Sequence, residues 1–274
     1  MLDMMSQAKN AIEAYNTALR ASSSNIANMN VTGYKRLDVS FQSIFERVLN
    51  RGTAAEAGMG GTNPRQFGQS MAVSNVSIDF SAGEHADGAN LDLAISGQGL
   101  FIVSPDGGNS YLYTRAGNFE IDSNGNLTSN GMQLYGLDSS DNLVAITELS
   151  GYDPNLLSWT SGGKLVQYKP NTDYTEIDFE TPYRIALTYF PNPSGLVQAQ
   201  GTAFAETPAS GSPATAQAVG GALGSVDPRR REQSNVFYLG ETIDALEIQR
   251  AMNGNLTVIR MASDMISQFI NRLS

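Results

Sequence analysis

The sequence contains no cysteine, and His85 is its single histidine. Without cysteine the chain can form neither a disulfide framework nor a thiolate metal site. A lone histidine, with only Glu84 and Asp87 near it in sequence, is a weak signal for a metal or acid–base centre. Charged residues are also scarce, at 16% against about 25% in typical soluble domains. Uncharged polar side chains must therefore cover much of the surface, which suits extensive contacts between subunits.

Positive charge and long apolar runs are scarce as well. The formal net charge is −10 and no basic stripe occurs, which argues against binding of nucleic acid through phosphate contacts. The one basic cluster, Arg229, Arg230 and Arg231, follows Pro228, and we expect it to be a solvated linker turn. No apolar run reaches about 18 residues, so we expect no membrane insertion. The N-terminus lacks a basic stretch followed by an apolar one, so we expect no cleaved secretory signal.

Enzyme signatures are missing too. The sequence has neither a G-x-S-x-G element nor a P-loop pattern. The stretch "DSNGN" at residues 122–126 resembles the start of a calcium loop, but Leu127 replaces the required glycine and Gln133 the required glutamate. Its Asn124-Gly125 dipeptide favours a type I′ hairpin turn instead. We therefore predict a chain with no catalytic residues, no cofactor and no metal site.

Both ends of the sequence have the pattern of long amphipathic helices, with apolar residues at spacings of three and four. The N-terminal stripe consists of Met5, Ala8, Ile12, Tyr15, Leu19, Ser22, Ile26 and Met29. The C-terminal stripe consists of Ala245, Ile248, Met252, Asn255, Ile259, Ala262, Ile266, Phe269 and Leu273, and Leu246, Leu256, Met265 and Ile270 widen it. We predict that these helices pair as a coiled-coil-like domain, and that the remaining apolar area is buried against other subunits.

Between the helices the apolar residues alternate, as in "VSNVSIDF", "LDLAIS" and "YRIALTYF", and turn dipeptides such as Asn130-Gly131 follow. We therefore predict an α+β fold with a central, mostly antiparallel β-domain. The expected parts are the N-terminal helix and its stop (1–50), a linker (51–72), a β-rich outer domain (73–205), a second linker (206–232) and the C-terminal helix (233–274).

Three blocks of the sequence together resemble the flagellar axial proteins, the rod and hook family of bacteria. The first is "SSNIANMNVTGYKR" at residues 23–36. The second is "LDLAISGQGLFIV" with "YTRAGNFEIDSNGNLTSNG", which includes Arg115. The third is "EQSNV", which begins at Glu232, with the helix after it. The blocks occur in the family's order and span both ends of the chain and the β-domain.

The resemblance implies a structural subunit, not an enzyme, whose terminal helices form a hollow tube with the β-domain outside. The implied partners are further copies of the chain in a helical homopolymer, other rod and hook proteins, and the flagellar type III export apparatus. The expected location is the extracytoplasmic, periplasm-spanning rod of the basal body. The expected subunit-interface residues are Ile12, Leu19, Asn25, Ile26, Asn28, Asn30, Gly33, Ser234, Asn235, Val236, Gln249, Arg250, Met252, Asn255, Ile259, Ile266 and Phe269.

The asparagines near residue 30 have two interpretations. By themselves the residues favour an ordinary helix end, where Asn25, Asn28 and Asn30 bond to local backbone. The resemblance favours a role in fixing the register between subunits, because buried polar groups need partners at defined positions. Two positions depart from the family pattern: Phe237 and Tyr238 replace an acidic helix start, and Gly254 replaces a better helix former.

The length of 274 residues favours a distal-type rod subunit, since typical hook subunits carry a further outer domain. A short hook subunit is an alternative, because the 60–73 stretch and "GMQLYG" are more hook-like. A proximal rod subunit is a further alternative. The competing class is a non-flagellar β-rich binding module or phage-tail module with helical arms.

Overall fold

The computed structural model describes residues 2–50, 61, 63, 65–170, 174–220 and 223–273. The chain divides into two compact units. Unit 1 consists of Met1–Ile26, Leu37–Ser77 and Phe237–Ser274, and unit 2 consists of Ala27–Arg36 and Ile78–Val236. Each unit is thus assembled from segments that lie far apart in the sequence.

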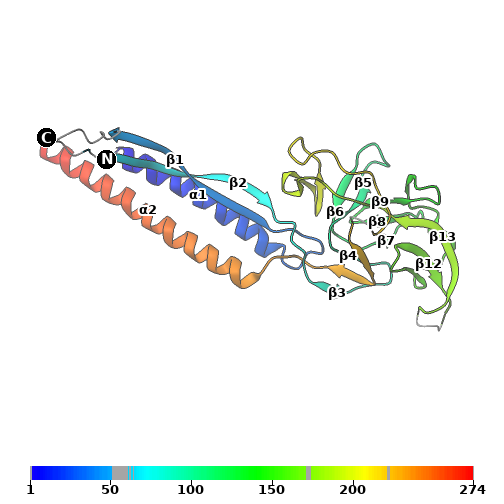
Figure 1. The fold of residues 1–274 in the computed structure, drawn as a ribbon. Coiled ribbons are helices and arrows are strands. Elements are labelled where there is room, and N and C mark those ends of the chain that lie inside the picture. The colour runs from blue at the N-terminus through cyan, green and yellow to red at the C-terminus, as the bar shows by residue number, and fades with distance from the viewer. Residues whose placement is uncertain are drawn as a thin grey trace. The chain divides into compact units, whose positions relative to one another are not determined.

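Unit 1 contains two helices and a two-stranded sheet (Figure 1). The helices are α1 (Leu2–Ala27), whose last residue belongs to unit 2, and α2 (Tyr238–Leu273). The strands are β1 (Leu37–Asn50) and β2 (Arg65–Ile78), which pair with each other. The two terminal helices predicted from the apolar spacing are confirmed. The long strand β1 was not foreseen, because residues 37–50 were grouped with the helix and its stop.

The most buried face of α1 is made of small residues. Ala14, Ala18, Ala21 and Asn25, at spacings of three and four, are all buried, whereas the larger members of the predicted stripe are half-buried. Tyr15 of this helix meets Phe41 of β1 edge to face, with ring centroids 6.0 Å apart. Alanine side chains leave room for a neighbouring backbone to approach closely, so the buried face lies beside the stripe of larger residues and does not coincide with it.

On α2 the burial follows the predicted stripe over most of its length. The half-buried or buried members are Ala245, Ile248, Met252, Asn255, Ile259, Ala262 and Ile266. Phe269, near the end of the helix, departs from the stripe and is exposed. Another face of the helix exposes large apolar side chains, among them Leu239, Ile243, Leu246, Met261 and Met265. The described residues therefore cover one face of α2 and leave large apolar side chains exposed on the other.

Unit 2 is an antiparallel β-structure, as predicted. Its main sheet has the order β11-β12-β13-β9-β5-β6-β16-β15, while β10 and β8 also pair with β9, β7 with β8, and β14 with β5. Two small sheets, β17-β4 and β18-β3, complete it. The strands are β3 (His85–Asp87), β4 (Leu93–Ser96), β5 (Leu100–Ser104), β6 (Leu112–Thr114), β7 (Glu120–Ile121), β8 (Leu127–Ser129), β9 (Met132–Leu137), β10 (Leu143–Ala145), β11 (Leu157–Trp159), β12 (Lys164–Tyr168), β13 (Ile177–Ile185), β14 (Leu187–Thr188), β15 (Val197–Gln200), β16 (Ala203–Ala205), β17 (Ser225–Pro228) and β18 (Arg230–Glu232). Short 3₁₀ turns occupy Leu149–Gly151 and Pro193–Gly195.

The core of unit 2 centres on aromatic side chains. Phe119 lies edge to face with both Phe101 and Trp159, at ring-centroid distances of 5.1 and 6.3 Å. Trp159 is 1% exposed, and its indole nitrogen donates to the carbonyl oxygen of Leu91 at 2.8 Å. The single tryptophan of the chain thus reports on the folding of this core.

Two turn expectations have different outcomes. Asn130 and Gly131 both have positive φ, 50° and 78°, and join paired residues Ser129 and Met132, as a two-residue type I′ turn requires. Asn124-Gly125 does not form the expected type I′ turn, since Gly125 has a positive φ and Asn124 does not. It lies in a five-residue loop, 122–126, whose Asp122 carboxylate accepts the backbone N–H groups of Asn124 and Asn126. The side chain of Asp122 thus organises this turn.

The two expected linkers also differ from the structure. Residues 51–60 of the first lie outside the described residues, and its end from Arg65 onward is part of β2. The second contains β17 and β18, which pair with β4 and β3. Glycine and alanine content suggested a linker, but cross-strand pairing outweighs composition here. Arg229 alone forms the turn between these strands, and its guanidinium lies 4.7 Å from the centre of the Tyr174 ring.

Candidate functional site

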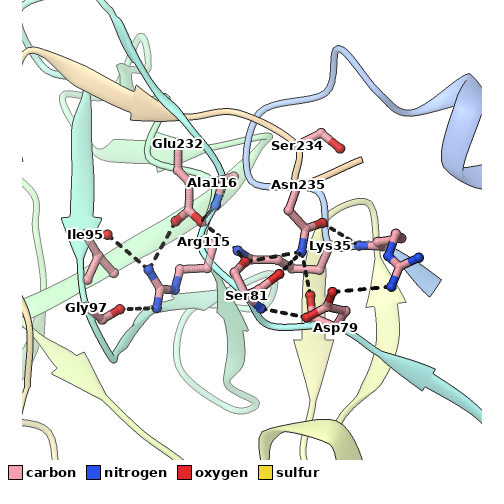
Figure 2. Close-up of polar contacts among 12 residues, drawn as sticks. Lys35, Asp79, Ser81, Ile95, Gly97, Arg115, Ala116, Glu232, Ser234 and Asn235 are labelled. Atoms are coloured by element: carbon pink, nitrogen blue, oxygen red, sulfur yellow. Dashed lines mark hydrogen bonds and ion pairs between the residues drawn. The ribbon is translucent and has the colours of Figure 1, made fainter. Parts of the chain in front are cut away.

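The first and third blocks of the sequence meet in unit 2 (Figure 2). The backbone N–H of Gly33 donates to the carbonyl oxygen of Glu232 at 2.8 Å. Around this bond lie four side chains, Lys35, Arg115, Glu232 and Asn235, which we call the Glu232 cluster. Each of the four comes from one of the blocks quoted above, so the cluster gathers residues from all three.

The carboxylate of Glu232 is fully buried and accepts three hydrogen bonds. Oε1 accepts from the Lys35 ammonium at 2.6 Å and from the backbone N–H of Gly83 at 2.9 Å. Oε2 accepts from Nη1 of Arg115 at 3.1 Å. The side chains of Lys35 and Glu232 are 0% exposed and that of Arg115 is 6% exposed. Bonds to charged donors in such a dry setting are strong and directional.

The two cations also bond to backbone carbonyl groups. Lys35 donates to the carbonyl oxygen of Ser81 at 2.7 Å, and Arg115 donates to those of Ile95 at 3.1 Å and Gly97 at 2.5 Å. The Nε atom of Arg115 is buried without a partner. Arg115 thus joins β4 and the residue after it to Glu232.

The cluster holds two buried cations and one buried anion. Burial lowers the pKa of Lys35, and the Glu232 carboxylate opposes that shift. Burial also lowers the pKa of Arg115, again opposed by Glu232. A buried ion pair adds little net stability, but removing one partner leaves an uncompensated charge at a cost of about 3–5 kcal/mol. Loss of the Glu232 carboxylate should therefore cost more than the intact ion pairs contribute to stability.

The Asn235 side chain forms hydrogen bonds with the backbone of two other segments. Its Oδ1 accepts from the backbone N–H of Arg36 at 2.8 Å. Its Nδ2 donates to the carbonyl oxygens of Asp79 at 2.9 Å and Ser81 at 3.2 Å, and to the Ser81 hydroxyl oxygen at 3.0 Å. An aspartate could not donate these bonds, which explains the amide at this position. The 33–36, 79–83 and 232–235 segments are thus held together by Glu232 and Asn235.

Gly33 is required by its surroundings. Its φ is +69°, and a Cβ atom there would lie 2.3 Å from the backbone nitrogen of Ala116. Only glycine tolerates both the left-handed conformation and this close approach. The glycine of the N-terminal block is therefore also the residue that lies against the segment after β6.

Asn25, in unit 1, is bonded within the chain. It is 1% exposed, its Oδ1 accepts from the backbone N–H of Leu37 at 2.9 Å, and its Nδ2 donates to the carbonyl oxygen of Leu37 at 2.9 Å. The amide thus fixes the start of β1 relative to α1. Its role between subunits stays a prediction, as does that of Asn28 and Asn30.

The other predicted interface residues occupy two kinds of position. Half-buried side chains are those of Ile12, Leu19, Ile26, Ser234, Val236, Met252, Asn255, Ile259 and Ile266. Exposed side chains are those of Gln249, Arg250 and Phe269. Ser234 accepts the backbone N–H of Val236 at 3.3 Å. Lys35, Arg115 and Glu232 were not predicted as site residues, although all three stand in the quoted blocks. The available signal was the presence of charged residues in these blocks of a chain poor in charge.

No described part of the chain brings together a metal-binding group of three or more His, Asp or Glu side chains. His85 pairs with Asp227 across the β3 and β17 strands, with Nδ1 2.9 Å from Oδ2. Neither described helix has an apolar stretch long enough to cross a bilayer. Of the described polar groups, the Glu232 cluster is the one that joins all three sequence blocks.

Comparisons with known proteins agree with the resemblance to the flagellar rod and hook proteins. The family model described as "Flagella basal body rod protein" matches residues 5–35, and "Flagellar hook protein FlgE/F/G D1 domain" matches residues 94–152. The flagellar basal-body rod protein FlgG of Agrobacterium fabrum is 31% identical over 267 residues, which is 95% of both chains. The chain belongs to the flagellar rod and hook protein family.

Two further relatives of the chain differ in how much of their own length aligns with it. FlgG of Bacillus subtilis is 28% identical over 275 residues, 99% of both chains. The flagellar hook protein FlgE of Helicobacter mustelae is 37% identical over 134 residues, which is 48% of this chain and 29% of that protein. The chain is therefore a flagellar structural protein and not an enzyme, and the non-flagellar binding or phage-tail alternative is excluded.

Proposed function

We propose that this chain is a structural subunit of the flagellar rod, of the distal type, which polymerises through its terminal helices into a hollow helical tube that transmits torque. Near-complete alignment with two rod proteins supports this choice over the hook, whose protein shares less than a third of its length with the chain. A short hook subunit is the second candidate, because the shared 134 residues are more similar to the hook protein, at 37% identity.

The exposed apolar face of α2 is the observation that best supports polymerisation. Leu246, Met261 and Met265 are 53%, 53% and 46% exposed, although they are large and apolar. Large apolar side chains exposed on one face of a helix often mark an interface. In the proposed tube, α1 and α2 pair in a coiled-coil-like domain, and this face of α2 packs against neighbouring copies. The expected neighbours also include other rod and hook proteins. The subunit would arrive at the assembly site by export through the flagellar type III apparatus.

Immunogold labelling of purified hook–basal bodies tests the location, with antibody against unit 2. Label between the membranes is expected for a rod subunit, and label on the curved external segment would transfer the chain to the hook. Absence of label from both places would contradict either assignment.

A charge on the exposed face of α2 tests the polymerisation surface. Met261→Asp should leave the monomer folded, because the side chain is half exposed, and should abolish assembly and motility. Ser267→Asp is the matched control, since it adds the same charge at an exposed polar position of the same helix. Normal assembly of Met261→Asp would remove this face from the interface.

A further inference from the structure

The Glu232 cluster joins parts of the chain that are far apart in sequence. Lys35 and Glu232 are separated by 197 positions, and Arg36 and Asn235 by 199. By contrast, the hairpin that precedes β9 pairs residues Ser129 and Met132 across a two-residue turn. Contacts between distant positions cost more loop-closure entropy and form late unless something else brings them together.

The buried charges give a second reason why the segments should dock in a fixed order. Arg115 is near enough to lower the pKa of Lys35, so the two cations repel each other. In the closed unit Gly33 lies against Ala116, and the Lys35 ammonium and the Arg115 guanidinium are both buried. Two buried cations without an anion would be strongly unfavourable. Glu232 is the one carboxylate that bonds both cations in the described part of unit 2.

We infer that the Glu232 cluster is a conformational lock: the 33–36 segment docks on unit 2 only after the 232–235 segment is in place. Unit 2 therefore closes in a last step, and only on a chain whose two ends are both free to meet. The biological meaning rests on the proposed function. A subunit that passes unfolded through an export channel cannot close this lock until both the 33–36 and the 232–235 segments have left the channel, so unit 2 stays open while either segment is inside.

The order of closure can be measured on the full-length monomer by pulsed hydrogen exchange during refolding. The amide of Ile146, which donates to the Leu134 carbonyl oxygen, reports on the sheet, and Trp159 fluorescence reports on the core. The amide of Gly33, which donates to the Glu232 carbonyl oxygen, reports on the lock. We expect Gly33 to gain protection at least about tenfold more slowly than Ile146. Protection of both amides in one phase would overturn the inference.

Variants test the role of charge. In Glu232→Gln, the refolding rate measured by Trp159 fluorescence should stay within about twofold of that of the unaltered chain. The Gly33 amide should lose its protection from hydrogen exchange, because Lys35 and Arg115 then lack their anion. Adding Lys35→Met to that variant should restore the protection of Gly33 at least about tenfold, since the second buried cation is gone. A purely structural role for Glu232 would give no such rescue. If Glu232→Gln does not fold, the order measured on the unaltered chain still decides.

The matched control is Glu180→Gln in the same unit. Glu180 pairs with Lys164 at 3.1 Å, but both side chains are about half exposed, so no change in either amide is expected. These measurements use purified monomer. Failure of the immunogold experiment would contradict the proposed function and its connection to export, but not the order of closure. Protection of both amides in a single phase would contradict the order of closure, wherever the protein is located.

Discussion

Asn25 holds both backbone groups of Leu37, accepting its N–H and donating to its carbonyl oxygen, each at 2.9 Å. One buried side chain thus connects the end of α1 to the first residue of β1. An amide can do this because it carries an acceptor and a donor two bonds apart, which matches a single peptide residue.

Asn25→Ala should therefore destabilise unit 1 by about 1–3 kcal/mol, because it leaves the partly buried N–H and carbonyl oxygen of Leu37 without this partner. The loss should appear as a lower urea midpoint of the helical circular dichroism signal. Asn30→Ala is the control, since Asn30 is exposed. Equal midpoints for the two variants would show that the Asn25 bonds contribute little.

Gly33→Ala should destabilise unit 2 by more than about 3 kcal/mol, because the new Cβ adds a backbone clash to the left-handed strain. Gly107→Ala is a matched control: its φ of +70° nearly equals the +69° of Gly33, but its Cβ would meet nothing within 4 Å. That control should cost only about 1 kcal/mol. Denaturant unfolding followed by Trp159 fluorescence separates the two costs, and similar losses would argue against close contact between Gly33 and Ala116.

The pH dependence of unit 2 should be set by aspartates in its turns. Backbone N–H groups of Asn126 and Asn142 are the largest causes that hold the pKa of Asp122 and of Asp138 below the ordinary value of 3.8, and hydrogen bonds from Ser110 do the same for Asp106. The unfolded carboxylates take up protons first, so this stability is present above pH 3.8 and is lost as the pH falls through the lowered values. Asp92 acts in the opposite direction, since burial raises its pKa and its contribution is lost as the pH rises.

The lowered pKa values of the three turn aspartates should outweigh the raised pKa of Asp92, so we expect unit 2 to be less stable in acid. The test is the urea midpoint of Trp159 fluorescence between about pH 5 and about pH 3. Asp122→Asn should flatten the decline, because Asn cannot gain a proton in this range, whereas Asp178→Asn, at an exposed position on β13, should not. A decline of unchanged steepness in Asp122→Asn would assign the acid sensitivity to other groups.

The sequence predicted regular elements better than it predicted their partners. Apolar spacing identified both terminal helices and the antiparallel β-domain, because those patterns are local. It did not identify β1, since residues 37–50 become a strand through pairing with β2, a partner across the 51–64 stretch. It also misjudged the turn at 122–126, where the Asp122 side chain determines the backbone conformation and the Asn-Gly dipeptide does not.

The Glu232 cluster shows the same limit more sharply. Lys35, Arg115 and Glu232 were recognisable as parts of three blocks, but no local pattern pairs residues separated by 117 and 197 positions. Asn235 and Gly33 were expected between subunits, and within the chain they bond to Arg36 and to Glu232. Residues that were expected to contact other subunits thus make hydrogen bonds within their own chain.

Gly254 provides the last prediction, because it is a glycine inside a helix with no local reason for being one. It lies in the interior of α2 and is exposed, and a Cβ atom there would meet nothing within 4 Å apart from the helix's own backbone. Gly254→Ala should therefore stabilise the helix in the monomer by about 0.5–1 kcal/mol, since alanine loses less conformational freedom than glycine. Thermal melting of the helical circular dichroism signal measures this gain. A loss would contradict the open surroundings of Gly254.

Assembly of the same variant then gives a second, independent reading. Gly240→Ala is the control, because its Cβ would meet only the exposed Phe237 ring, at 3.2 Å, near the start of α2. If the more stable Gly254→Ala monomer assembles less well and Gly240→Ala does not, we would conclude that the added methyl group meets a neighbouring subunit, since none of the residues that the structure describes places another atom there. If both variants assemble normally, no neighbour approaches α2 closely at Gly254, and the contact surface lies along the apolar side chains of Leu246 and Met261 instead.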